Sequence, residues 1–169
     1  SLVRQLHYMF GLTDHSGYLE VPRGRTRAKI IMAKSPTRSP IIGRILGENL
    51  KSVSKDPANE VALLVMHGPE RKEENDEELR NLARLAAVVK DVTGIAEVFY
   101  GSLQDDAPPE IRAANVARMR EWIAKANASG KTVLVEPVLL TASGRVSQKI
   151  GKDLGGLSYT FVDKGMIGH

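Results

Sequence analysis

Residues 60–69, which decide the fold, read EVALLVMHGP. The six residues from Val61 to Met66 form an unbroken apolar run, which is typical of a strand buried on both faces of a parallel sheet. The run stops at His67, and the Gly-Pro pair that follows indicates a turn. A buried strand that ends in a polar side chain favours an α/β protein whose site lies at the strand ends.

The chain after this run alternates between strand-like and helix-like patterns. Strands are expected over 61–66, 95–100, 132–140 and 159–162. Helices are expected over 73–89, from 105–110 to a stop at Gly130, and over 145–154. The order β-α-β-α-β-α-β predicts a parallel sheet with helices on both faces. Right-handed crossovers then gather His67, residues 104–106 and residues 141–145 at one edge of the sheet.

The first third of the chain is less regular. A helix is expected over 1–10 with Gly11 as its stop, and the Gly, Pro, Asp and Ser content of 12–27 indicates a loop. A short strand is expected over 28–33. A turn follows over 35–40, and apolar residues at helical spacing then predict a helix over 41–53 that ends before Asp56-Pro57.

The composition excludes several classes of function. The 169 residues contain no cysteine, which removes disulfides, thiolate metal sites and cysteine nucleophiles and fits a cytoplasmic location. No apolar run approaches the roughly 18 residues that a membrane span needs, so no membrane partner is expected. The sequence holds no P-loop, no GxGxxG after a strand and no GxSxG nucleophile elbow.

The net charge of +4 is concentrated near the start of the chain. Residues 1–60 hold 10 Lys and Arg against 5 Asp and Glu, with most of the basic residues between Arg23 and Arg38. Such a cluster can bind nucleic acid or an anionic small molecule, or it can be a solvated loop. Nucleic acid is not the expected partner, because the rest of the chain is near neutral and lacks a basic recognition helix.

Few side chains at the expected sheet edge could carry chemistry. His67 can bind a divalent metal or take a proton near neutral pH, or it can simply hydrogen-bond a loop. Asp105 and its neighbour Asp106 suit a helix cap more readily than a metal site. Glu136 is either a ligand, a supporting acid or part of a bend, and Arg145 is either an anion clamp or a surface residue.

Four segments together resemble the class II tetrapyrrole chelatases, the CbiX-type sirohydrochlorin cobaltochelatases and ferrochelatases. They are LLVMHG at 63–68, the helix at 75–85, LQDDAP at 103–108 and VEPVLL at 135–140. Residues 1–11 also resemble the helix that follows a ligand histidine in these enzymes. The resemblance implies a flavodoxin-like α/β fold built from two similar halves, with the tetrapyrrole bound between them.

The resemblance also implies a domain division. Residues 60–169 resemble a complete second half, and residues 1–59 resemble the tail of a preceding half with its connecting helix. The chain is therefore expected to be a fragment of a longer protein, or to pair with a second copy that rebuilds the cleft. The basic cluster from Arg23 to Arg38 would suit the carboxylates of sirohydrochlorin.

The implied reaction is insertion of Co²⁺ or Fe²⁺ into sirohydrochlorin, in cobalamin or siroheme biosynthesis, without an organic cofactor. His67 matches the family's His-Gly position and is expected to be the metal ligand or the proton acceptor. Gln104, Asp105 and Arg145 are expected to contact the substrate. Gln104 stands where relatives carry a glutamate, and Arg145 lies where they carry a histidine, so the alternative is a tetrapyrrole- or metal-binding module without catalysis.

Overall fold

A computed structural model of the chain describes residues 2–16, 20–31, 35–142 and 144–167. The chain divides into two compact units, Ser1–Ser35 and Pro36–His169. The larger unit contains the sheet and every residue proposed for the site.

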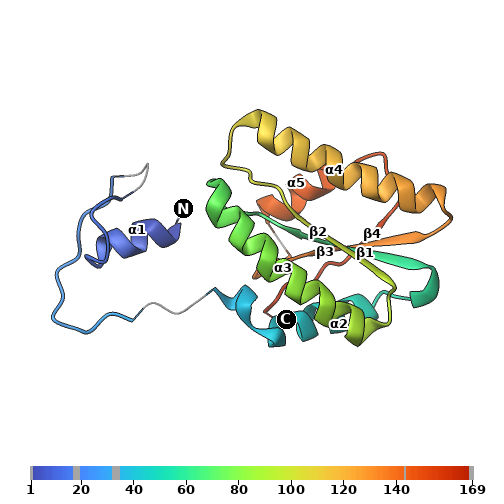
Figure 1. Cartoon of the computed structure of the whole chain (residues 1–169), viewed down its shortest axis with the longest axis horizontal. Helices are drawn as coiled ribbons and strands as arrows, with labels where there is room; N and C mark the ends of the chain where they lie inside the picture. The colour runs from blue at the N-terminus through green and yellow to red at the C-terminus, as the bar shows by residue number, and fades with distance from the viewer. Residues whose placement is uncertain (1, 17–19, 32–34, 143, 168–169) are drawn as a thin grey trace. The chain divides into compact units, whose positions relative to one another are not determined.

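The larger unit is an α/β structure around a four-stranded, wholly parallel sheet, consistent with a flavodoxin-like fold (Figure 1). The strands are β1 (Glu60–Met66), β2 (Glu97–Ser102), β3 (Thr132–Pro137) and β4 (Thr160–Phe161). Their order across the sheet is β2-β1-β3-β4, so β1 is hydrogen-bonded on both sides and β2 forms one edge. The β-α-β-α-β-α-β order predicted from the sequence is confirmed.

Helices cover both faces of this sheet (Figure 1). They are α2 (Pro40–Lys51), α3 (Lys72–Thr93), α4 (Pro109–Ala128) and α5 (Arg145–Asp153), with short 3-10 turns at Pro36–Arg38 and Pro57–Asn59. Helices α2 and α3 pack on one face, and α4 and α5 pack on the other. The start of α2 is fixed by Ser39, whose hydroxyl accepts a hydrogen bond from the Ile41 N–H, and by Pro40 in its first turn.

Strand β1 separates two hydrophobic cores, because successive side chains of a strand point to opposite faces. Ala62, Leu64 and Met66 face α2 and α3, whereas Val61, Leu63 and Val65 face α4 and α5. All seven residues of the strand are buried. The unbroken apolar run in the sequence is therefore explained by burial on both faces.

Helix α2 belongs to the sheet-containing unit, although the expected division at residue 60 separates it from the sheet. Two glycines let it approach α3 closely: a Cβ on Gly43 would lie 2.8 Å from the Cβ of Val88, and one on Gly47 would lie 2.6 Å from a Val92 methyl carbon. The compact unit that holds the sheet therefore includes α2 and begins at Pro36.

Two expected strand segments are absent from the described residues. Residues 28–31 are irregular, with the Ile31 side chain 78% exposed, and the remainder of the segment expected over 28–33 lies outside the described residues. Residues 138–140 do not extend β3, because β1 has already ended at Met66. Instead, the carbonyls of Leu139 and Leu140 accept hydrogen bonds from residues 166 and 167 of the C-terminal segment.

The smaller unit contains helix α1 (Leu2–Met9), which confirms the helix expected at the start of the chain. Gly11 follows it with a left-handed φ of 71°. Arg23 lies over the ring of Tyr8 and bonds Asp14 at 3.0 Å, which holds the following loop to the helix. Among the helices that the structure describes, none is both long and apolar enough to cross a membrane.

Replacing Leu64 with alanine should lower the free energy of unfolding by about 2–5 kcal/mol, because the fully buried side chain would leave a cavity beneath α2 and α3. Chemical denaturation followed by circular dichroism measures this change. The matched control is Ile41→Ala on α2, where the side chain is 62% exposed and a change within about 0.5 kcal/mol is expected. Equal losses in the two variants would contradict the central position of β1.

Candidate functional site

His67 lies where β1 ends, at the carboxyl edge of the sheet. Its Nδ1 atom is 2.9 Å from the carbonyl oxygen of Gly68, so the neutral ring can donate Nδ1–H and present the lone pair of Nε2. Gly68 has a φ of 75°, and a Cβ there would lie 2.6 Å from the Cβ of Ser102 at the end of β2. Glycine is therefore required for the turn that sets this ring orientation.

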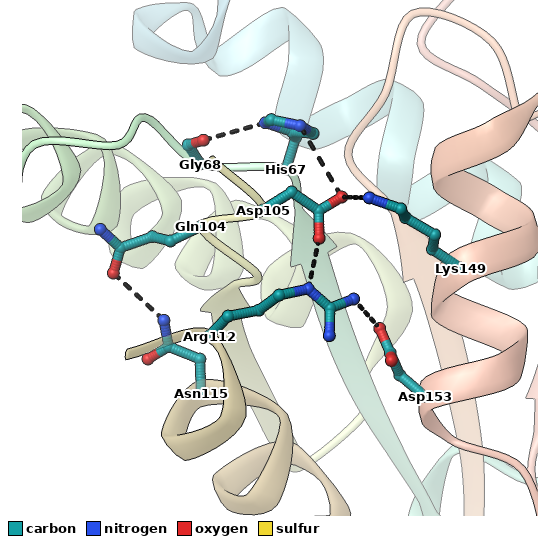
Figure 2. A network of polar contacts seen from close by, with 8 residues as sticks. All are labelled: His67, Gly68, Gln104, Asp105, Arg112, Asn115, Lys149 and Asp153. Atoms are coloured by element: carbon teal, nitrogen blue, oxygen red, sulfur yellow. Dashed lines mark hydrogen bonds and ion pairs between the residues drawn. The ribbon is translucent and has the colours of Figure 1, made fainter. Parts of the chain in front are cut away.

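Asp105 is the centre of a charged network beside His67 (Figure 2). Its Oδ1 accepts a hydrogen bond from Arg112 Nε at 2.7 Å, and its Oδ2 accepts one from Lys149 Nζ at 3.0 Å. The Nε2 of His67 is 3.8 Å from the same Oδ2 atom. The Asp105 side chain is only 3% exposed, so the network joins the ends of β1 and β2 to α4 and α5.

The charge of Asp105 is maintained by its two basic neighbours. Burial is the largest single influence and raises the pKa of this carboxyl, but the hydrogen bonds and charges of Arg112 and Lys149 together outweigh it. The net result is a lowered pKa, so Asp105 is ionised near neutral pH. It does not cap α4, which begins after Pro108 without a side-chain cap.

Gln104 has a structural role that the sequence did not indicate. It is buried and has a left-handed φ of 53°. Its Nε2 atom donates to the carbonyls of Pro69 at 3.1 Å and Glu70 at 3.3 Å. Its Oε1 accepts a hydrogen bond from Asn115 at 3.1 Å (Figure 2). A glutamate here would place a carboxylate against two carbonyl oxygens, so an amide is the appropriate side chain at this position.

The remaining expected substrate contact, Arg145, lies at the first position of α5 with an exposed side chain. Lys149 lies one turn further along α5 with its side chain 51% exposed. The structure therefore brings His67 and Asp105 together, adds Lys149 to them, and leaves Arg145 accessible at the start of the same helix.

Sequence reasoning missed three members of the network, which are Arg112, Lys149 and Asp153. Arg112 bonds both Asp105 and Asp153 at 2.7 Å, and it thereby joins α4 to the end of α5. Arg112 lies seven residues after Asp105, but the chain turns into α4 between them, and no local pattern indicates that they meet. The meeting of α4 with α5 depends on how the two helices pack side by side on one face of the sheet, which the sequence pattern does not specify.

Glu136 lies on β3, points to the face of the sheet that α2 and α3 cover, and is fully buried. Its Oε1 accepts a hydrogen bond from Asn49 of α2 at 3.1 Å, and the same amide donates to the carbonyl of Gly165 at 3.2 Å. Burial raises the pKa of Glu136 to about 8, although Asn49 and the charge of Lys164 act in the opposite direction. Glu136 is therefore mainly protonated at neutral pH, which suits a structural acid better than a metal ligand.

The described residues contain no group of three or more His, Asp and Glu side chains arranged to hold a metal ion. Comparisons of the chain with family models, with curated proteins and with solved structures each find no match.

Replacing Asp105 with asparagine should lower the free energy of unfolding by about 1–3 kcal/mol, because Arg112 and Lys149 would lose their ionised partner. Because the pKa of Asp105 is lowered in the folded protein, its ionised carboxylate stabilises the fold at pH values above the ordinary carboxyl range. This stabilisation is lost as the pH falls through the lowered pKa. Denaturation at pH 7 and at acid pH measures both effects. The control is Asp106→Asn, whose exposed side chain predicts little change, and equal effects would contradict the network.

The raised pKa of Glu136 predicts that stability falls as pH rises from about 5 to 8. The folded protein holds this proton while the unfolded chain, with a pKa near 4.5, has released it, so raising the pH favours unfolding. Glu136→Gln should make the free energy of unfolding less dependent on pH in this interval and should increase it at pH 8. Glu48→Gln, at an exposed position of α2, serves as the control. Identical pH profiles for the wild type and Glu136→Gln would rule this explanation out.

Proposed function

We propose that the protein binds sirohydrochlorin or a related tetrapyrrole at the carboxyl edge of its sheet and acts as a chelatase that inserts Co²⁺ or Fe²⁺. The observation that carries this proposal is the orientation of His67, whose Nδ1 faces the Gly68 carbonyl and whose Nε2 is 3.8 Å from Asp105. A histidine held in this way by a backbone carbonyl is suited to bind a metal or accept a proton through Nε2.

The proposed reaction needs a base and a way to hold an anionic macrocycle. Insertion replaces pyrrole N–H bonds with bonds from nitrogen to the metal, and the released protons must be accepted. In the proposal, Nε2 of His67 first contacts the incoming ion and then takes a proton, while solvent takes the rest. The half-exposed ammonium of Lys149 and the exposed guanidinium of Arg145 bind peripheral carboxylates of the substrate.

The surroundings of Asp105 favour a second candidate function, which is tetrapyrrole binding without metal insertion. Both of its carboxylate oxygens already accept hydrogen bonds from basic side chains, one from Arg112 and one from Lys149. These positive charges attract carboxylates and repel a divalent cation. The same edge would then bind the macrocycle through its acidic groups, and His67 would contact it without catalysing insertion.

The test mixes sirohydrochlorin with Co²⁺ or Fe²⁺ and the protein, and follows the absorbance change of the macrocycle. Metal insertion above the uncatalysed rate is expected, and His67→Ala should reduce it by about 10²-fold or more, because ligand and base are lost together. The control is His15→Ala, which removes an exposed histidine from the smaller unit and should leave the rate unchanged.

Direct binding separates the two candidate functions. Titration of sirohydrochlorin without metal should show binding that weakens in Lys149→Ala, because an ammonium facing the substrate is lost. Binding without insertion would select the second candidate. Absence of both binding and insertion would reject both functions for this chain.

A further inference from the structure

Strand β2 leaves one edge of the sheet open. It pairs with β1 on one side only, and no strand of the described residues lies on its other side. Edge strands of monomeric proteins are commonly protected by a charged residue or a proline in the strand. The central residues of β2, from Val98 to Gly101, contain neither, and the side chains of Val98, Phe99 and Tyr100 are only partly buried.

A hollow of about 400 Å³ follows this edge. Its lining comes from β2 and from both flanking helices, with Leu79 of α3 on one side and Asn115, Arg118 and Trp122 of α4 on the other. The rings of Phe99 and Trp122 stack with centroids 5.2 Å apart, which gives the hollow a flat aromatic wall. A second hollow of about 360 Å³ lies on the α3 side of the same strand.

The charges at this edge are placed at its two ends. Glu97 is at the beginning of β2, with its side chain 51% exposed and bonded to Lys131 at 3.0 Å. Arg118 lines the hollow near the other end and is exposed, and it makes no hydrogen bond or ion pair within the described part of the chain. One edge therefore carries Glu97, with its partner Lys131, at one end, and towards the other end Arg118, which has no partner among the described residues.

We propose that this edge is the interface of a symmetric dimer, in which β2 of one copy pairs antiparallel with β2 of a second copy. A twofold axis perpendicular to the sheet joins two β2 edges in opposite directions and keeps the α4 helices of both copies on the same face. A pairing centred on Phe99 keeps opposed side chains on the same face and places Glu97 of each copy alongside Gly101 of the other, which lines the hollow together with Arg118. Arg118 then lies near that Glu97, so the two charges complement each other twice.

A second copy fits this edge better than a small molecule does. An open parallel strand presents a row of backbone N–H and C=O groups, and another strand satisfies that whole row. The hollows on both sides of β2 would receive apolar side chains from a strand whose residues alternate between the two faces. The edge is also self-complementary in charge, as a symmetric interface requires.

The test is sedimentation velocity of the full 169-residue chain over about a hundredfold range of concentration. A monomer–dimer equilibrium is expected. Arg118→Glu should raise the dissociation constant about tenfold or more, because two attractive pairs per dimer become repulsive. Glu97→Arg should have a similar effect, and the double variant Glu97→Arg/Arg118→Glu should restore most of the affinity. Arg44→Glu, at an exposed position of α2, is the control and should behave as the wild type.

The double variant makes the result specific to this surface. A monomer at every concentration would overturn the proposal, as would a dimer whose dissociation constant is unchanged in both single variants. A dimer that the single variants weaken and the double variant does not restore would overturn the antiparallel pairing of Glu97 with Arg118. Circular dichroism of each variant verifies that the fold is retained. These readouts use neither tetrapyrrole nor metal, so they are independent of the proposed chelatase activity.

Discussion

The burial of β1 on both faces is the constraint on which the rest of the larger unit depends. This strand hydrogen-bonds to β2 on one side and β3 on the other, and its alternate side chains enter two separate cores. Helices on both sides of the sheet are needed to cover them. The same strand delivers His67 to the sheet edge, so the position of the candidate site follows directly from the packing of the core.

Much of this arrangement could be predicted from the sequence because it is encoded locally. The apolar run of β1 and the acidic and proline-rich starts of the helices specify elements over a few residues. The prediction of a strand over 28–33 was wrong for residues 28–31, which are the described part of that segment. Strand-forming residues need a neighbouring strand to pair with, and residues 28–31 are irregular. The predicted extension of β3 over 138–140 was wrong because its partner β1 ends at Met66. The length of β3 is therefore set by a strand that lies elsewhere in the sequence.

The sequence predicted only those residues of the candidate site that directly follow a strand. His67 and Asp105 each follow a strand, and parallel topology brings them to one edge. Arg112 and Lys149 come from helix faces, and their meeting at Asp105 depends on how α4 and α5 lie against the sheet. The carboxylate thereby joins two helices to the sheet while sitting beside the histidine. The packing of the two helices and the surroundings of His67 consequently depend on one side chain.

The contacts of the Gln104 amide restrict which amino-acid substitutions this site can accept during evolution. Its donor group faces two carbonyls and its acceptor group faces Asn115. Its backbone has a φ of 53°, which is uncommon for residues other than glycine. Exchange to an acid alters one atom of the side chain but reverses the polarity of the contacts with both carbonyls. A carboxylate could therefore be tolerated here only after the neighbouring turn at Pro69 and Glu70 had moved. Substitutions that move the turn at Pro69 and Glu70 would therefore have to come before a replacement of Gln104 by glutamate.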